Sequence, residues 1–284
     1  MSFWLSNVFS GISFGMLLFL LASGLTLTLG LLRIINLAHG SFYLLGSYVG
    51  VSIATYIGNF YLAVVIGAIT IGILGLGLQR VLLRRYAIGE TEQVLLTFGC
   101  LFFFADLALC VWGGHPVYIP SPAYFQQSMK LGGSAVSIYK LIIIALGTAV
   151  AILLWWFQER TRYGAIIRAG VDDEQMTEAM GINIILTKSL VFGLGALLAG
   201  LAGVAGGSFI GAYPGVDMEV LLLSLIVVVI GGAGSLKGSL IGALLIGLVR
   251  NFSVAFIPQF SLAIIYLPMV IVLVLRPQGL FGRK

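Results

Sequence analysis

The chain has 284 residues, of which 60% are hydrophobic and 9% are charged, and its formal net charge is +5. Soluble domains are about half apolar and about a quarter charged, so this composition excludes an ordinary soluble protein. It predicts an integral membrane protein whose basic excess reflects topology and contact with anionic lipid, with no role in nucleic-acid binding.

Apolar runs recur along the whole chain, and each is close to the roughly 20 residues that a helix needs to cross a bilayer. They predict an all-α polytopic bundle of about eight or nine transmembrane segments, forming one domain over residues 1–284. Segment 220–230 is short, so the sequence leaves open whether it crosses fully or re-enters. The expected segments are residues 8–32, 37–57, 60–83, 94–112, 141–157, 188–210, 220–230, 236–256 and 262–275.

The basic residues predict the orientation, because Lys and Arg close to helix ends are retained on the cytoplasmic side. If nine segments alternate, twelve of the 15 basic residues fall on one side, whereas Lys130, Lys140 and Arg250 fall on the other. The N-terminus is therefore expected outside and the C-terminus in the cytoplasm. The first apolar run is too long for the core of a signal peptide, so no cleaved export signal is expected.

The first connection reads "RIINLAHGS" and places polar groups between two apolar runs. Arg33 would mark the cytoplasmic end of the first helix, and Asn36 could cap the next one, with His39 and Ser41 facing inward from its first turns. One interpretation is a tight hairpin whose polar groups satisfy backbone donors that lipid would leave unpaired. The other is that Asn36 and His39 border an inner gate, where an interrupted helix meets a solvated cavity.

The fourth apolar segment contains one carboxylate, Asp106. Such a charge costs roughly 2.5–3.5 kcal/mol at a helix centre, so Asp106 is expected either to line a substrate pathway or to pair with a polar neighbour. Cys100 and Cys110 lie on the same segment, too far apart for a disulfide, and are expected to be buried packing residues.

The outward loop 113–139 is rich in Gly and Pro, which favour turns over helix, and would cover the outer mouth. Its aromatic residues suit either an interfacial belt or a docking surface for an external partner.

The inward segment 158–187 carries eight of the 25 charged residues and contains one short helix signal. Asp172 could cap this helix with Gln175 as its partner, Asp173 and Glu174 suit its N-terminal dipole, and Gly181 could end it. A helix of about two turns cannot be stable alone, so its apolar stripe must rest either on the membrane domain or on a partner protein. The stripe consists of Met176, Ala179 and Met180.

Small residues repeat every four positions at Gly234, Gly238 and Gly242, and a similar series runs from Ala196 to Gly211. Such faces let helices approach closely, either as plain packing or as a sliding gate or subunit interface. The glycine-rich "GGAGSLKG" lacks the Gly-Lys-Ser/Thr of a nucleotide-binding P-loop, and no metal or hydrolase motif is present. The chain is therefore expected to hold no cofactor of its own and to be no enzyme.

Three stretches together resemble one family. They are "GLTLTLGLLRIINLAHGSFYLLGSYV", "IIRAGVDDEQMTEAMGINI" and "VIGGAGSLKGSLIGALLIG", followed by "LRPQGLFG" at the C-terminus. They occur in the order found in permease subunits of branched-chain amino acid ATP-binding-cassette (ABC) importers, and the chain resembles that family over most of its length.

The resemblance implies a permease domain with a cytoplasmic coupling loop at 158–187, whose helix enters a groove on an ATPase. It implies a second homologous permease, two ATPase subunits that bind ATP-Mg, and a periplasmic binding protein, assembled at the bacterial inner membrane. Expected pathway or gate residues are Asn36, His39, Ser41, Asp106, Gly231, Gly232, Gly234 and Gly238. Expected coupling residues are Asp172, Asp173, Glu174, Met176, Glu178, Met180 and Gly181.

The substrate implied is a small amino acid such as leucine, isoleucine or valine, and urea, short amides and aromatic acids remain alternatives. A competing hypothesis is an ion-coupled secondary transporter in which Asp106 senses the gradient, although few charges are expected at the midplane. A third is a membrane scaffold without transport.

Overall fold

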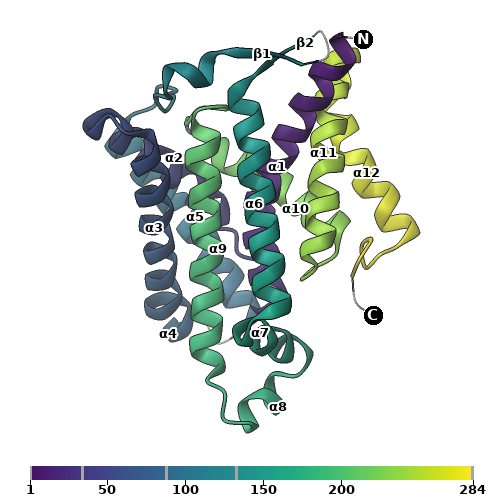
Figure 1. The fold of residues 1–284 in the computed structure, drawn as a ribbon. Coiled ribbons are helices and arrows are strands. Elements are labelled where there is room, and N and C mark those ends of the chain that lie inside the picture. Colours follow the sequence, from purple (N-terminus) through teal and green to yellow (C-terminus); the bar gives the residue numbers. More distant parts are fainter. Residues whose placement is uncertain (1, 33–34, 87–88, 132–133, 283–284) are drawn as a thin grey trace.

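The protein is a bundle of long helices in a computed structural model that describes residues 2–32, 35–86, 89–131 and 134–282 (Figure 1). Its helices are α1 Ser2–Leu32, α2 His39–Ile57, α3 Phe60–Leu78, α4 Arg84–Tyr86, α5 Glu90–Trp112, α6 Ile138–Arg160, α7 Arg162–Asp172, α8 Glu174–Ala179, α9 Ile184–Gly207, α10 Val216–Gly231, α11 Leu236–Phe256 and α12 Ser261–Leu275. A π-helical turn, Gln79–Leu83, joins α3 to α4, and 3₁₀ turns occupy Ala123–Gln126 and Pro258–Phe260.

Seven helices among the described residues are long and apolar enough to cross a membrane. This confirms the expected all-α polytopic membrane fold. The spans are Phe3–Leu31, Phe60–Tyr86, Glu90–Trp112, Ile138–Arg160, Ile184–Gly207, Leu236–Phe256 and Pro258–Leu275. The expected segments 37–57 and 220–230 are not among them; they correspond to α2 and α10.

The loop 113–139, which is expected outside, contains a small antiparallel hairpin, β1 Ser128–Leu131 and β2 Ser134–Ser137, in which Ser128 pairs with Ser137. Gly and Pro in this loop do prevent long helices, and the hairpin holds the two β-strands of the described residues. Val117 forms a further bridge with Ala212, which ties this loop to the segment before α10.

α1 is the central helix, since 89% of its most apolar stretch is buried inside the bundle, against 11% of the apolar stretch that contains α12. It packs against α11 and α9, and small residues allow the close approach. Gly24 faces Gly195 of α9, and Gly15 faces Gly247 of α11. The small-residue faces of α9 and α11 are therefore packing surfaces inside this chain.

α2 and α10 both begin inside the bundle. The His39 ring at the start of α2 lies 2.9 Å from the carbonyl oxygen of Leu21, which precedes Leu31 by about 15 Å along α1. The start of α10 is at the same place, because a Cβ on Gly40 would overlap the carbonyl oxygen of Asp217. Two helix N-termini thus meet within the depth of the apolar spans.

Segment 158–187, which is expected in the cytoplasm, is mostly helical. α6 continues to Arg160, α7 follows as a separate amphipathic helix, and α9 begins at Ile184, where the Asn183 side chain accepts a hydrogen bond from the Leu186 amide at 2.9 Å. The sequence analysis predicted one short helix here, whereas the segment contains both α7 and α8. It missed α7 because this helix mixes apolar and charged residues and has no long apolar run.

Candidate functional site

Asn36 lies directly before α2 but does not cap it. Its Oδ1 accepts a hydrogen bond from the Ala38 amide at 3.1 Å, and the N-cap position is Ala38, which makes no side-chain cap. The expected cap is therefore wrong, because the helix begins at His39 and not at residue 37, which leaves Asn36 in the turn that precedes it. Arg33, expected to mark the end of α1, lies outside the described residues, as do Arg283 and Lys284.

His39 and Ser41 point into the bundle as expected, and both are fully buried. The Ser41 hydroxyl donates to the carbonyl oxygen of Leu101 at 3.0 Å, which joins α2 to α5. The Nε2 atom of His39 meets the Leu21 carbonyl, while its Nδ1 atom has no partner. Both bond to backbone carbonyl groups of other helices, so neither satisfies a backbone donor as the hairpin interpretation expects; among these residues Asn36 does so, and the gate role stays a prediction.

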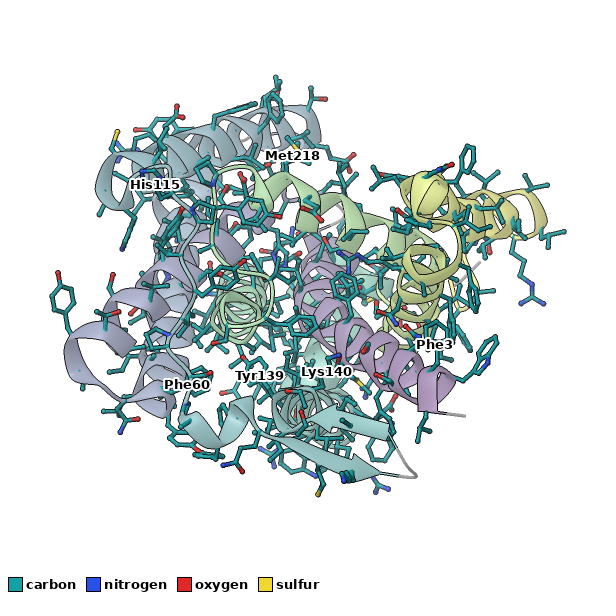
Figure 2. All side chains as sticks on the ribbon, turned by 90° about the horizontal axis from the view of Figure 1, so that it is seen from above. Phe3, Phe60, His115, Tyr139, Lys140 and Met218 are labelled. Atoms are coloured by element: carbon teal, nitrogen blue, oxygen red, sulfur yellow. The ribbon has the colours of Figure 1, made fainter. Side chains whose placement is uncertain are left out.

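The first two turns of α10 carry an exposed polar side chain within an apolar bundle. Met218, Glu219 and Leu222 are exposed, and the Tyr213 hydroxyl donates to Oε2 of Glu219 at 2.8 Å. Figure 2 shows Met218 on the side of the bundle opposite Tyr139 and Lys140 of α6. Hydrocarbon cannot solvate a carboxylate, so this face of α10 must border water or another protein.

Further polar groups gather at this face, and together they are called the Glu219 patch. Arg250 of α11 and the Tyr213 hydroxyl lie within electrostatic range of Glu219. The buried hydroxyl of Tyr43 also lies within electrostatic range of Glu219. Arg250 is anchored from α11, with its guanidinium 4.0 Å from the centre of the Phe14 ring.

An acid and a base within electrostatic range of each other could bind the two ends of a zwitterion, because a carboxylate binds an ammonium group and a guanidinium binds a carboxylate. The sequence analysis missed this patch. Glu219 stood just outside the expected apolar segment, and Arg250 entered only the count of basic residues. The one available signal was a Tyr and a Glu on either side of Pro214 and Gly215, a break before an apolar run.

Asp106 is exposed on α5, and within the described part of the chain it makes no hydrogen bond or ion pair. The expected pairing is therefore absent among the described residues. The pathway role stays a prediction, since an exposed carboxylate in an apolar span needs water or a partner beside it.

The four expected gate glycines lie where α10, α11, α1 and the C-terminal tail converge. Gly238 packs directly on Gly231, and Gly234 lies against Gly30 of α1. Gly232 has a φ of +93°, and a Cβ there would meet the backbone of Gly282. These glycines allow close packing within one chain, and whether they also move is a prediction.

The tail "LRPQGLFG" closes the end of α10. The Leu280 amide donates to the Ile230 carbonyl at 2.8 Å, and the Phe281 amide donates to the Gly231 carbonyl at 3.1 Å. Carbonyl groups at a helix C-terminus otherwise lack partners. The stretch "VIGGAGSLKGSLIGALLIG" and the C-terminal "LRPQGLFG" thus form one structural unit.

α8 lies at the far end of the molecule from the N-terminus (Figure 1). Its N-cap is Asp173, whose Oδ1 accepts a hydrogen bond from the Met176 amide at 2.9 Å, and not Asp172, which is the last residue of α7. The cap was misplaced by one residue because two helices meet here, and the sequence analysis expected one. Gly181 follows the helix with a φ of +82° and ends it as expected.

The apolar stripe of α8 faces away from the chain. Met176 and Met180 are 61% and 76% exposed, whereas Thr177 is the residue buried against the bundle. Lys188 of α9 forms an ion pair with Glu174 at 2.6 Å, which holds the helix in place. The interpretation in which the stripe rests on the membrane domain is therefore wrong.

Seven helices able to cross a membrane and two helices that begin within their depth, all among the described residues, define a polytopic membrane protein. The chain belongs to the family described as branched-chain amino acid transport system / permease component, whose sequence model matches residues 7–273.

Two relatives match almost end to end. The chain is 28% identical to the high-affinity branched-chain amino acid transport system permease protein BraD of Pseudomonas aeruginosa, over 99% of this chain and 96% of that protein. It is also 28% identical to the permease protein LivH of the corresponding Escherichia coli system, with the same coverage. Among solved structures, PsaBC from Streptococcus pneumoniae in complex with Fab has the same fold, with a TM-score of 0.50 at 15% identity over 95% of this chain and 89% of that one.

Proposed function

We propose that this chain is the transmembrane permease subunit of an ABC importer that moves branched-chain or similar small amino acids into the cytoplasm of a bacterium. The observation that carries the proposal is the family match over residues 7–273, together with relatives aligned over 99% of the chain. Because the sequence has no P-loop, ATP-Mg would be bound by two separate ATPase subunits. A second homologous permease and a periplasmic binding protein would complete the importer.

The proposed topology has nine passes, with the N-terminus outside and the C-terminus in the cytoplasm. Seven are the full spans, and the partial helices α2 and α10, with the segments that precede them, make the other two. Basic residues near helix ends support this orientation, since Arg84 and Arg85 and the α7–α8 loop then share the inner side with the C-terminal tail.

Transport would follow alternating access. Closure of the ATPase dimer on ATP would push α8 through its exposed methionines, and α7 and α9 would pass the movement to the bundle. The substrate would travel along the exposed face of α10, between this chain and its homologous partner, past the Glu219 patch. The Glu219 carboxylate supports this path, because a helix face that borders only lipid would not carry a carboxylate.

The test is purification from the native membrane with a tag on this chain, followed by mass spectrometry and by uptake assays in proteoliposomes. We expect an ATPase pair and a second permease to co-purify, and uptake of labelled leucine to need ATP and to resist an ionophore. Repeated recovery of the chain alone, with uptake that the ionophore abolishes, would refute the proposal and support ion coupling.

A further inference from the structure

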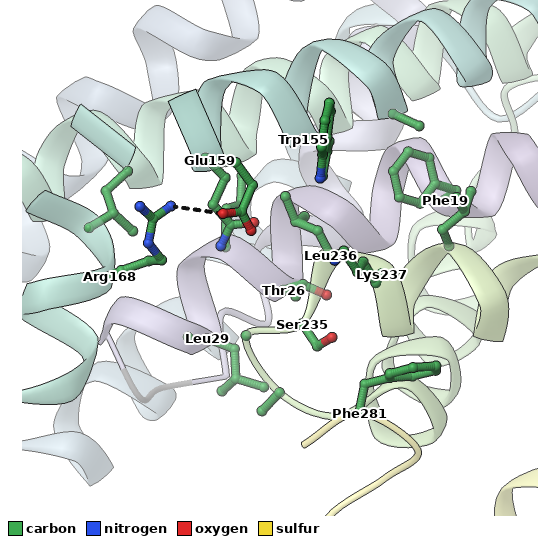
Figure 3. Close-up of a pocket in the computed structure, with 18 of the residues that line it drawn as sticks. Phe19, Thr26, Leu29, Trp155, Glu159, Arg168, Ser235, Leu236, Lys237 and Phe281 are labelled. Carbon is green, nitrogen blue, oxygen red and sulfur yellow. Dashed lines mark ion pairs between the residues drawn. The ribbon is translucent and has the colours of Figure 1, made fainter. Parts of the chain in front are cut away.

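A cavity of about 720 Å³ lies between α1, α6, α7 and the start of α11 (Figure 3). It follows α1 from Met16 to Leu31, a distance of about 22 Å along the helix axis. It is separate from the Glu219 patch, since none of the four patch residues lines it.

The wall of the cavity changes character along its length. Its deep part is formed by apolar side chains such as Phe19, Ile152 and Leu240, whereas its inner end carries Glu159, Arg168 and Lys237. Trp155 lies next to this end and is 46% exposed. Tryptophan is typical of the membrane interface, so the charged end lies at the level of lipid headgroups.

The charges favour an anionic ligand. Nη1 of Arg168 is buried without a hydrogen-bond partner, and it is 3.9 Å from Oε2 of Glu159, too far for a hydrogen bond. Lys237 is exposed at the mouth, so two cations face one carboxylate. A guanidinium with a free donor is the group that binds phosphate best.

We propose that this cavity binds one anionic phospholipid of the inner leaflet, with an acyl chain along α1 and the headgroup phosphate at the charged end that Arg168 and Lys237 line. The length agrees, because half of a hydrocarbon core is about 15 Å and the headgroup region adds several more. The volume is within the roughly 300–1,000 Å³ of ligand sites. A small amino acid would leave most of the apolar part unfilled.

Bound lipid would control the coupling loop. Ile167, Arg168 and Val171 line the cavity from α7, and α7 leads directly into α8. A lipid seated there would hold α7 against α1 and α11, so that α8 moves only together with the bundle. An empty cavity would let α7 shift independently.

Lipid binding can be measured without any transport assay, so its failure is distinguishable from failure of the proposed function. The full-length chain, purified with whatever subunits accompany it, is delipidated in mild detergent and its thermal unfolding is followed with phosphatidylglycerol, phosphatidylcholine or inorganic phosphate added. We expect phosphatidylglycerol alone to raise the midpoint, by roughly 4 °C. Equal effects of the two lipids, or an equal effect of inorganic phosphate, would overturn the proposal.

Variants locate the site. Arg168→Gln with Lys237→Gln should weaken phosphatidylglycerol retention in native mass spectrometry about tenfold, as should Ala151→Trp, which fills the cavity without a change of charge. Arg160→Gln with Arg162→Gln is the matched control, since both side chains are exposed and neither lines the cavity. Full retention by the first two variants, or an equal loss in the control, would contradict this location.

Discussion

At the scale of single residues, Glu219 is the side chain whose position most needs a function. It is exposed at the start of a helix that begins inside the bundle, and its neighbours on that face are Met218 and Leu222. Its hydrogen bond from Tyr213 leaves further lone pairs of the carboxylate free. A substrate ammonium group would donate hydrogen bonds to these lone pairs. Without such a partner, the carboxylate would be costly in lipid.

Replacing Glu219 by Gln should therefore reduce amino acid uptake. The charge-assisted contact is worth about 1.5–3 kcal/mol, so uptake at low substrate concentration should fall roughly tenfold or more. The measurement is initial uptake of labelled leucine by proteoliposomes that contain the assembled importer. Glu90→Gln, an exposed acid at the start of α5, should keep normal uptake. Wild-type uptake by Glu219→Gln would remove the patch from the pathway.

A second residue-scale prediction concerns the contact between the two broken helices. Gly40→Ala should destabilise the protein by about 1–3 kcal/mol, because the added methyl group would overlap the carbonyl oxygen of Asp217. Thermal unfolding in detergent measures the loss. Gly77→Ala is the matched control, since a Cβ at Gly77 meets no atom within 4 Å. Equal midpoints for the two variants would show that α2 and α10 are free to separate.

At the scale of elements, α8 combines a firm cap with a stripe that the chain itself does not cover. Asp173 and the ion pair from Lys188 hold the helix, and Thr177 is its buried residue. Exposed methionines adapt their shape to a partner surface, which suits a helix that must move while docked.

Met176→Glu with Met180→Glu should abolish co-purification of the ATPase subunits while the permease still inserts in the membrane. Two carboxylates would replace the two most exposed apolar side chains of α8, and burying them in a groove would be unfavourable. Met129→Glu, on the outer hairpin, is the control with the same chemistry and should leave the complex intact. If the double variant still binds the ATPases, the docking site lies elsewhere in the loop.

Hydropathy predicts the long helices well, because each buried or lipid-facing helix is a run of apolar residues. The bounds of α11 agree with the sequence to the residue, and those of α3 with its π-helical turn do as well. It fails for α7, which lies outside the apolar spans, and for the starts of α2 and α10. Those starts depend on Gly40 meeting Asp217 and on His39 reaching Leu21, contacts between segments far apart in sequence.

At the scale of the whole molecule, the candidate site is assembled from distant parts of the chain. The Glu219 patch joins residues of α2, the segment before α10, α10 itself and α11. Sequence analysis found the glycine cluster and the short helix α8 because their residues are close together in sequence. It could not find a patch whose members are brought together only by the crossing of the helices.

The arrangement of the whole chain predicts which loops face which side of the membrane, and cysteine labelling tests it. The native thiols allow a clean background, because Cys100 is buried and exposed Cys110 can be changed to Ser. In that background, Tyr56→Cys should react with a membrane-impermeant maleimide in spheroplasts, since Tyr56 is 89% exposed near the end of α2 that is expected outside. Met180→Cys should react only after the membrane is permeabilised. The reverse pattern would invert the topology and place α8 where no ATPase could reach it, whereas labelling of both without permeabilisation would mean that α3, α5 or α6, the spans between the two positions, does not cross.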